Sequence, residues 1–154
     1  MALEIRPPQN SEEWGKYYET RWQVLRAPWK QPRGSEQDNL EAQAYHLIAL
    51  ESTTPLGVGR IHLNTPTEAQ VRYMAVIPEA QGKGIGRKIL AKLEQHMRHQ
   101  GVRMIVLNAR ESAVQFYEPA GYHIIAQIPS LYKIPHWKMR KLLWRGLLLE
   151  STQD

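Results

Sequence analysis

The sequence contains no cysteine, and this absence excludes several kinds of chemistry at once. Without thiols the chain has no disulfide framework, no thiolate nucleophile and no cysteine-ligated zinc site. The opening residues, Met-Ala-Leu-Glu-Ile-Arg, lack the apolar core of a signal peptide, and no later apolar run is long enough to span a bilayer. We therefore expect a cytoplasmic protein without a membrane partner.

Motifs of nucleic-acid recognition are missing as well, because no helix-turn-helix, zinc-finger or RNA-binding pattern occurs. The net charge of +5 suits an anionic cofactor as well as a nucleic acid. A basic run holds Lys138, Arg140, Lys141 and Arg145, and since charge runs usually form solvated faces we expect no nucleic-acid partner. With 154 residues, 42% of them hydrophobic, residues 1–154 are expected to form a single domain.

The most informative stretch is residues 71–90, which reads as a strand, a glycine turn and a helix. Val71–Ile77 is apolar enough for a buried strand, and Pro78 ends it because proline has no backbone N–H to donate. From Ile85 the apolar residues recur with helical spacing. The glycines in between let backbone N–H groups approach a ligand where the helix directs the positive end of its dipole. We interpret this turn as a site for a polyanion, best suited to a pyrophosphate.

Three cations in and after the turn strengthen that interpretation, namely Lys83, Arg87 and Lys88. The glycines stand at 82, 84 and 86, a spacing that fits neither the dinucleotide fingerprint G-x-G-x-x-G nor the P-loop. They do fit Q-x-x-G-x-G, from Gln81 to Gly86, after a strand that contains Met-Ala-Val. This pattern resembles the acetyl-CoA loop of the Gcn5-related N-acetyltransferase family. A purely structural turn with chance glycines is the alternative.

The rest of the chain is predicted to alternate between helices and strands. Asn10 and Glu13 have the spacing of a helix N-cap pair, and the helix that follows ends before Pro28. Further helices are expected at about 85–100 and 112–117, and strands at 3–6, 44–51, 56–63, 71–77, 102–107, 122–128 and 136–143. Loops are expected at 29–39, as a substrate lid or an irregular connector, and at 129–135.

This order of elements predicts a mixed sheet. The strands within residues 44–77 form an antiparallel meander, and the helix between the strands 71–77 and 102–107 implies a parallel crossover. We therefore predict an α/β (α+β mixed) fold. Its sheet is mostly antiparallel, with a central parallel strand pair whose ends splay to open a cleft, and helices cover both faces.

A second block, from Leu107 to Tyr122, is similar to the block of the same family that ends in F-Y-x-x-x-G-[FY]. The predicted order of elements is also the order of that family, so the chain is identified as a member. Membership implies acetyl-CoA as co-substrate, and we expect no metal. It implies that backbone groups of the central strand and of the turn, together with one asparagine side chain, hold the cofactor. These residues are Met74, Ala75, Val76, Gln81, Gly82, Lys83, Gly84, Ile85, Gly86, Arg87 and Asn108.

The same resemblance assigns Tyr117 as the general acid that protonates the departing CoA thiolate. The chemistry is consistent, because the pKa of a phenol, about 10, is close enough to that of a thiol, about 8.5, for a positioned tyrosine to return a proton to a basic thiolate. The alternative for Tyr117 is a core aromatic beside Phe116.

An amine acceptor must lose its ammonium proton to a base. Some family members carry a glutamate for this on the central strand, whereas this chain has Arg72 there. His136 is the candidate base, since histidine is the residue type that titrates near neutral pH. The sequence around Arg26, Arg72, Arg110 and His136 looks like that of small N-acetyltransferases that act on glyphosate and on amino acids. By that resemblance the three arginines bind a carboxylate or phosphonate, and His136 is the base. For each arginine, a structural ion pair with a glutamate is the alternative.

The expected function is acetyl transfer from acetyl-CoA to a small primary amine that bears an acidic group, by direct attack in a ternary complex. A protein or peptide N-acetyltransferase and a non-catalytic acyl-CoA sensor are the alternatives. No cluster of histidines and carboxylates indicates a metal site. The tail, residues 144–154, is expected either to extend the last strand or to cover the partner in a homodimer with Leu147, Leu148 and Leu149.

Overall fold

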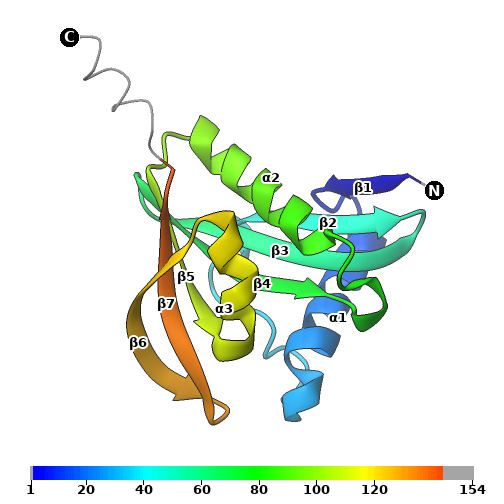
Figure 1. Cartoon of the computed structure of the whole chain (residues 1–154). Helices are drawn as coiled ribbons and strands as arrows, with labels where there is room; N and C mark the ends of the chain where they lie inside the picture. Colours follow the sequence, from blue (N-terminus) through cyan, green and yellow to red (C-terminus); the bar gives the residue numbers. More distant parts are fainter. Residues whose placement is uncertain (1, 144–154) are drawn as a thin grey trace. The chain divides into compact units, whose positions relative to one another are not determined.

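The computed structural model describes residues 2–143, so both predictions for the tail 144–154 lie outside the described part. Figure 1 labels the helices and strands. The described strands are β1 (Leu3–Arg6), β2 (Tyr45–Glu51), β3 (Thr54–Thr65), β4 (Glu68–Val76), β5 (Met104–Arg110), β6 (His123–Leu131) and β7 (Ile134–Leu142). The described α-helices are α1 (Ser11–Leu25), α2 (Ile85–His99) and α3 (Val114–Tyr117). None of these helices has the length and apolarity to cross a bilayer.

The seven strands form one sheet in the order β1-β2-β3-β4-β5-β7-β6. Antiparallel ladders join β1 to β2, β2 to β3, β5 to β7 and β6 to β7. The parallel ladder joins Glu68–Gln70 of β4 to Met104–Val106 of β5, while β4 runs on to Val76 and β5 to Arg110. The predicted mixed, mostly antiparallel α/β fold with a parallel pair is therefore confirmed.

The chain divides into two compact units. The first contains the described residues up to His62 together with Val71–Leu93, and the second contains Leu63–Gln70 and the described residues from Glu94 onward. The organisation of residues 1–154 as one domain stays a prediction.

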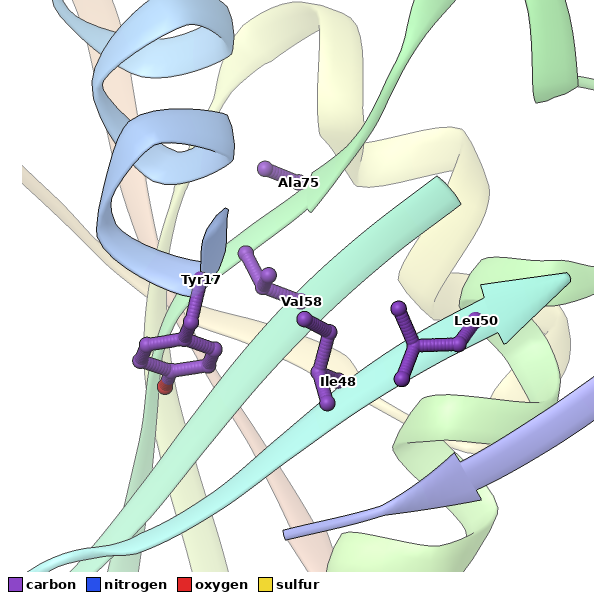
Figure 2. Close-up of a cluster of buried hydrophobic side chains, with 5 residues drawn as sticks. All are labelled: Tyr17, Ile48, Leu50, Val58 and Ala75. Carbon is purple, nitrogen blue, oxygen red and sulfur yellow. The ribbon is translucent and has the colours of Figure 1, made fainter. Parts of the chain in front are cut away.

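In the first unit, neighbouring residues of β3 point to helices on opposite faces of the sheet. Val58 belongs to a buried cluster with Tyr17 of α1, which Figure 2 shows together with Ile48, Leu50 and Ala75. Gly59 faces α2, because a Cβ at this position would lie 2.7 Å from Cγ2 of Ile89. Successive strand residues point to opposite faces, so α1 and α2 cover the two sides of β3, as the sequence predicts.

In the second unit, a buried carboxylate joins the end of α2 to the strand β7. Glu94 is only 4% exposed. Its Oε2 accepts a hydrogen bond of 2.8 Å from the Tyr122 hydroxyl, and its Oε1 accepts one of 2.9 Å from Nζ of Lys141. A buried charge is tolerated when it is paired and hydrogen-bonded in this way.

One local prediction near the start of the chain is confirmed, and another near its end is wrong. Oδ1 of Asn10 accepts a hydrogen bond of 2.9 Å from the Glu13 N–H, which is the predicted N-cap. The predicted loop 129–135 is wrong, because β6 continues to Leu131 and β7 begins at Ile134. Proline is tolerated at position 129 because β6 is an edge strand of the sheet.

Candidate active site

The glycine turn, residues 81–86, leads directly into α2. Gly82 and Gly84 have φ angles of 78° and 82°, which side chains with a Cβ rarely adopt. A Cβ at either glycine would meet nothing within 4 Å, so the backbone conformation requires these glycines and packing does not. The earliest helical hydrogen bond joins the Lys88 N–H to the carbonyl of Gly84, at 3.1 Å. The N–H groups just before it have no partner inside the helix and lie at the positive end of its dipole.

The side chains around this turn are positively charged. Lys83, Arg87 and Lys88 are exposed, and none of them forms an ion pair with a carboxylate in the described part of the chain. Gln81 has a structural contact, because its Nε2 donates a hydrogen bond of 3.1 Å to the carbonyl of Val76. This bond ties the turn to the end of β4, so exposed N–H groups and three cations are presented beside the strand end.

The ring of Tyr73 in β4 is surrounded by arginines of the first unit. The guanidinium carbons of Arg21, Arg72, Arg60 and Arg26 lie 4.1, 4.5, 5.0 and 5.5 Å from the ring centroid. Cations are attracted to the negative face of an aromatic ring at such distances. The structure therefore brings together two of the arginines predicted to bind substrate, Arg26 and Arg72.

Two members of this cluster are structural, because the side chains of Arg21 and Arg60 are completely buried. Nη1 of Arg21 and Nη1 of Arg60 each donate a hydrogen bond of 2.9 Å to Oε2 of Glu41. Nη2 of Arg21 also donates to the hydroxyl of Tyr17, at 2.8 Å. That hydroxyl lies 2.7 Å from Nδ1 of His46, and burial lowers the pKa of this imidazole below its ordinary value.

Arg72 is paired with Asp38, from the loop 29–39. Its Nη1 donates a hydrogen bond of 2.7 Å to Oδ2 of Asp38, although the Arg72 side chain remains 44% exposed. Burial alone would raise the pKa of Asp38. The hydrogen bonds from Arg60 and from the Leu40 N–H outweigh that effect and hold the pKa well below its usual range. The loop is therefore fastened to β3 and β4 by a carboxylate that is ionised at neutral pH.

The side-chain hydrogen bonds of Arg26 go to carbonyl groups. Its Nε donates a hydrogen bond of 3.0 Å to the carbonyl of Ser35, and its Nη1 donates one of 3.2 Å to the carbonyl of Leu25. Among residues 2–143, no carboxylate pairs with it. Carbonyl groups do not neutralise a guanidinium, so Arg26 keeps its full charge.

The second unit carries the remaining predicted residues on β5, β7 and α3. The antiparallel register places Arg110 directly opposite His136, and Asn108 opposite Lys138. Opposite residues project from the same face of an antiparallel pair, and so do residues two positions apart on one strand. The sheet therefore brings Asn108, Arg110 and His136 to one face, and Lys138 shares it.

The contacts of His136 fix the form of its imidazole. Its Nδ1 lies 2.8 Å from the carbonyl oxygen of Ile134, and a carbonyl only accepts hydrogen bonds. Nδ1 must therefore carry a proton, and in the neutral ring Nε2 keeps its lone pair. His136 is in this way prepared to accept a proton at Nε2.

Tyr117 is 7% exposed, and its ring packs edge-on against Phe116 and Tyr122. Burial raises the pKa of Tyr117 well above its ordinary value of 10.0, and the charge of Arg110 opposes part of that rise. The phenol therefore keeps its proton at neutral pH. No hydrogen bond of the described residues uses its hydroxyl, which leaves that proton free for an incoming acceptor.

Sequence reasoning missed Asp38, Glu41 and Arg60, which organise the arginine cluster, and it missed the conformation of Tyr73. The φ angle of Tyr73 is 60°, a left-handed value that is unusual for an aromatic residue inside a strand. In the sequence, the charged residues of loop 29–39 were the available signal for these ion pairs, but their partners lie far away along the chain. No group of three metal-ligating side chains occurs among the residues that the structure describes.

Comparisons with known proteins agree with this architecture. The family model described as the acetyltransferase (GNAT) family matches residues 11–122. YjcF of Bacillus subtilis (strain 168), an uncharacterized N-acetyltransferase, is 27% identical over 134 residues, which cover 86% of this chain and 95% of the relative.

Two solved structures show the same fold. An aminoglycoside 6′-N-acetyltransferase complexed with coenzyme A aligns with a TM-score of 0.79 at 15% identity, over 94% of this chain and 98% of that one. The PaiA N-acetyltransferase of Thermoplasma acidophilum, also in complex with coenzyme A, aligns with a TM-score of 0.76 at 18% identity, over 92% and 99% of the two chains. Because the family model spans most of the sequence, the chain belongs to the acetyltransferase (GNAT) family and is an N-acetyltransferase.

Proposed function

We propose that this enzyme transfers the acetyl group of acetyl-CoA to the amine of a small molecule that also bears an acidic group. The glycine turn supports the choice of cofactor, because unpaired N–H groups at the start of α2 and three exposed cations suit a pyrophosphate. Two structural relatives that are complexes with coenzyme A support it as well. The backbone of Met74–Val76 and the side chain of Asn108 are proposed to hold the pantetheine arm.

The proposed substrate class rests on the cross-strand pair of Arg110 and His136. A guanidinium binds a carboxylate or phosphonate through two parallel hydrogen bonds. An imidazole with a free Nε2 removes the proton of an ammonium group. A molecule whose acid and amine are a few bonds apart is complementary to both side chains. Arg26 and Arg72 are further candidates to bind the acid group of the substrate. Of these two, only Arg72 has a carboxylate partner among the described residues.

The proposed reaction is a direct transfer. His136 takes the ammonium proton, the neutral nitrogen attacks the acetyl carbonyl carbon, and the C–S bond breaks as the new C–N bond is completed. The electron pair of the broken bond stays on sulfur, and Tyr117 gives its proton to this thiolate. The nitrogen loses its second proton as the amide forms; by way of solvent this proton restores the Tyr117 phenol, and His136 releases the proton that it took. The chain has no cysteine, so it has no thiol for a covalent acyl-enzyme.

The test is a measurement of CoA release from acetyl-CoA with amino acids, aminophosphonates, polyamines and short peptides. We expect turnover with the acid-bearing amines. His136→Gln should lower kcat by about 10²-fold or more, as loss of a general base does. Arg110→Gln should raise KM for acid-bearing amines. The matched controls are His123→Gln and Arg140→Gln, which remove an exposed imidazole and an exposed guanidinium from the same sheet.

A preference for peptides or polyamines would refute the proposed substrate class and leave the acetyl transfer in place. Tight binding of acetyl-CoA without turnover of any amine would refute the catalytic proposal and favour an acyl-CoA sensor. Equal losses in His136→Gln and His123→Gln would refute the role of His136.

A further inference from the structure

The four arginines around Tyr73 carry more positive charge than their carboxylate partners among the described residues can neutralise. Three of their guanidinium groups share two carboxylates. Glu41 contacts Arg21 and Arg60, and Asp38 contacts Arg60 and Arg72. The fourth arginine, Arg26, has none. The cluster thus holds four cations against two anions, an excess that attracts an anionic ligand.

Only two members of the cluster are open to a ligand. Arg21 and Arg60 have no exposed surface, so their role is structural. The side chain of Arg72 is 44% exposed, and Arg26 is partly exposed. These two guanidinium groups lie 4.5 and 5.5 Å from the same ring centroid, so both are beside Tyr73.

Asp38 is held rigidly against one of these two arginines. Its Oδ2 accepts hydrogen bonds from Arg72 Nη1 at 2.7 Å and from Arg60 Nη2 at 3.0 Å. Its Oδ1 accepts hydrogen bonds from Arg60 Nη1 at 2.6 Å and from the Leu40 N–H at 2.9 Å. With four donors the carboxylate is fully satisfied, and a ligand cannot displace it without leaving the buried Arg60 short of a partner.

We propose that Asp38 determines the charge of the acid group that this enzyme accepts. It acts as a built-in counter-ion of Arg72, so of the two open arginines of this cluster only Arg26 contributes a full positive charge to the binding of the acid group, and a singly charged carboxylate is preferred over a phosphonate dianion. The inference rests on the proposed function, because it assumes an acid-bearing amine.

The preference follows from charge. Within this cluster, Arg26 offers the acid group one uncompensated cation. A dianion gains more from a further cation than a carboxylate does, but the charge of Arg72 is already shared with Asp38. The Asp38 carboxylate also repels the extra negative charge of the dianion at short range.

The experiment compares glycine with aminomethylphosphonate, which differ only in the acid group. For each compound, kcat and KM are measured with acetyl-CoA, and binding in the presence of CoA is measured by calorimetry. The variants are Arg26→Gln, Arg72→Gln, Asp38→Asn and the double variant Asp38→Asn/Arg72→Gln. Arg33→Gln is the control, because it removes an exposed guanidinium that pairs with Glu19.

We expect Arg26→Gln to raise KM for glycine about tenfold without a comparable change in kcat. Arg72→Gln and the Arg33→Gln control should change this KM less than about threefold. Asp38→Asn keeps an oxygen for Arg60 and frees the charge of Arg72. It should therefore shift the preference toward aminomethylphosphonate about tenfold, and the added Arg72→Gln change should abolish the shift.

The inference is overturned if Arg72→Gln raises KM for glycine as much as Arg26→Gln does, a comparison that stands even if Asp38→Asn fails to fold. It is also overturned if a folded Asp38→Asn variant keeps the wild-type preference. These outcomes leave the acid-bearing substrate class intact. If uncharged amines are acetylated while neither acid-bearing probe binds, the substrate class and this inference fall together.

Discussion

Replacement of Gly59 by alanine should loosen the contact between β3 and α2. A Cβ at this position would lie 2.6 Å from Sδ of Met74, 2.7 Å from Cγ2 of Ile89 and 3.2 Å from Cδ1 of Leu93. Favourable contacts between carbon atoms lie at about 3.5–4.0 Å. Side chains of α2 must leave their rotamers, or the helix must move by roughly 1 Å, and overpacking of this kind costs about 1–3 kcal/mol.

For a chain of this size a loss of 1 kcal/mol lowers Tm by about 2–4 °C, so we expect Tm to fall by roughly 2–12 °C. Thermal and urea unfolding, followed by circular dichroism, measure the change. The matched control is Gly15→Ala within α1, where a Cβ would meet nothing within 4 Å. Alanine there should stabilise the protein by about 0.5–1 kcal/mol, because glycine is unfavourable inside a helix. A Gly59→Ala variant as stable as the wild type would refute the packing argument.

Three other predictions follow from single contacts. Glu94→Gln removes the charge that pairs with Lys141 and should lower the free energy of unfolding by about 1–3 kcal/mol in urea titrations; an unchanged midpoint would contradict it. Burial lowers the pKa of His46 below its ordinary 6.5, so the unfolded chain binds its proton more readily. The contribution of neutral His46 to the free energy of unfolding should therefore be complete above pH 6.5 and decline as the pH falls below 6.5. His46→Gln should make this decline in stability smaller. Gly84→Ala should weaken CoA binding in calorimetry, whereas Gly101→Ala, with a similar φ of 83° beyond the other end of α2, should leave it unchanged.

Sequence reasoning succeeded where the determinants are local. The glycine turn could be predicted because positive φ angles at Gly82 and Gly84 require a residue without a Cβ, and the cap at Asn10 because its partner is three residues away. The hairpin between β6 and β7 was not predicted, because the sequence lacks the usual local signal for its turn. Its turn residues, Tyr132 and Lys133, have φ angles of 55° and 61° without the glycine or asparagine that normally marks such a turn.

The arginine cluster shows which part of a site cannot be predicted from one sequence. Arg26 and Arg72 were singled out by resemblance, but the partner of Arg72 is 34 residues away in the chain. Local propensity does not encode a contact of that length, because it depends on how the loop 29–39 folds back onto β3 and β4. The register of β5 with β7, which sets Arg110 opposite His136, likewise emerges only from the folded sheet.

The role of Tyr117 in the transfer step is the central chemical claim, and one comparison tests it most directly. The initial rate of CoA release is measured for the wild type, Tyr117→Phe and Tyr122→Phe, with an amine that the wild type acetylates. Tyr122 is the matched control, because its hydroxyl donates to Glu94 and should affect stability alone. We predict that Tyr117→Phe lowers kcat by about 10²-fold or more at unchanged stability, while Tyr122→Phe keeps a kcat close to the wild-type value. A Tyr117→Phe enzyme that releases CoA at the wild-type rate would contradict the proposed mechanism.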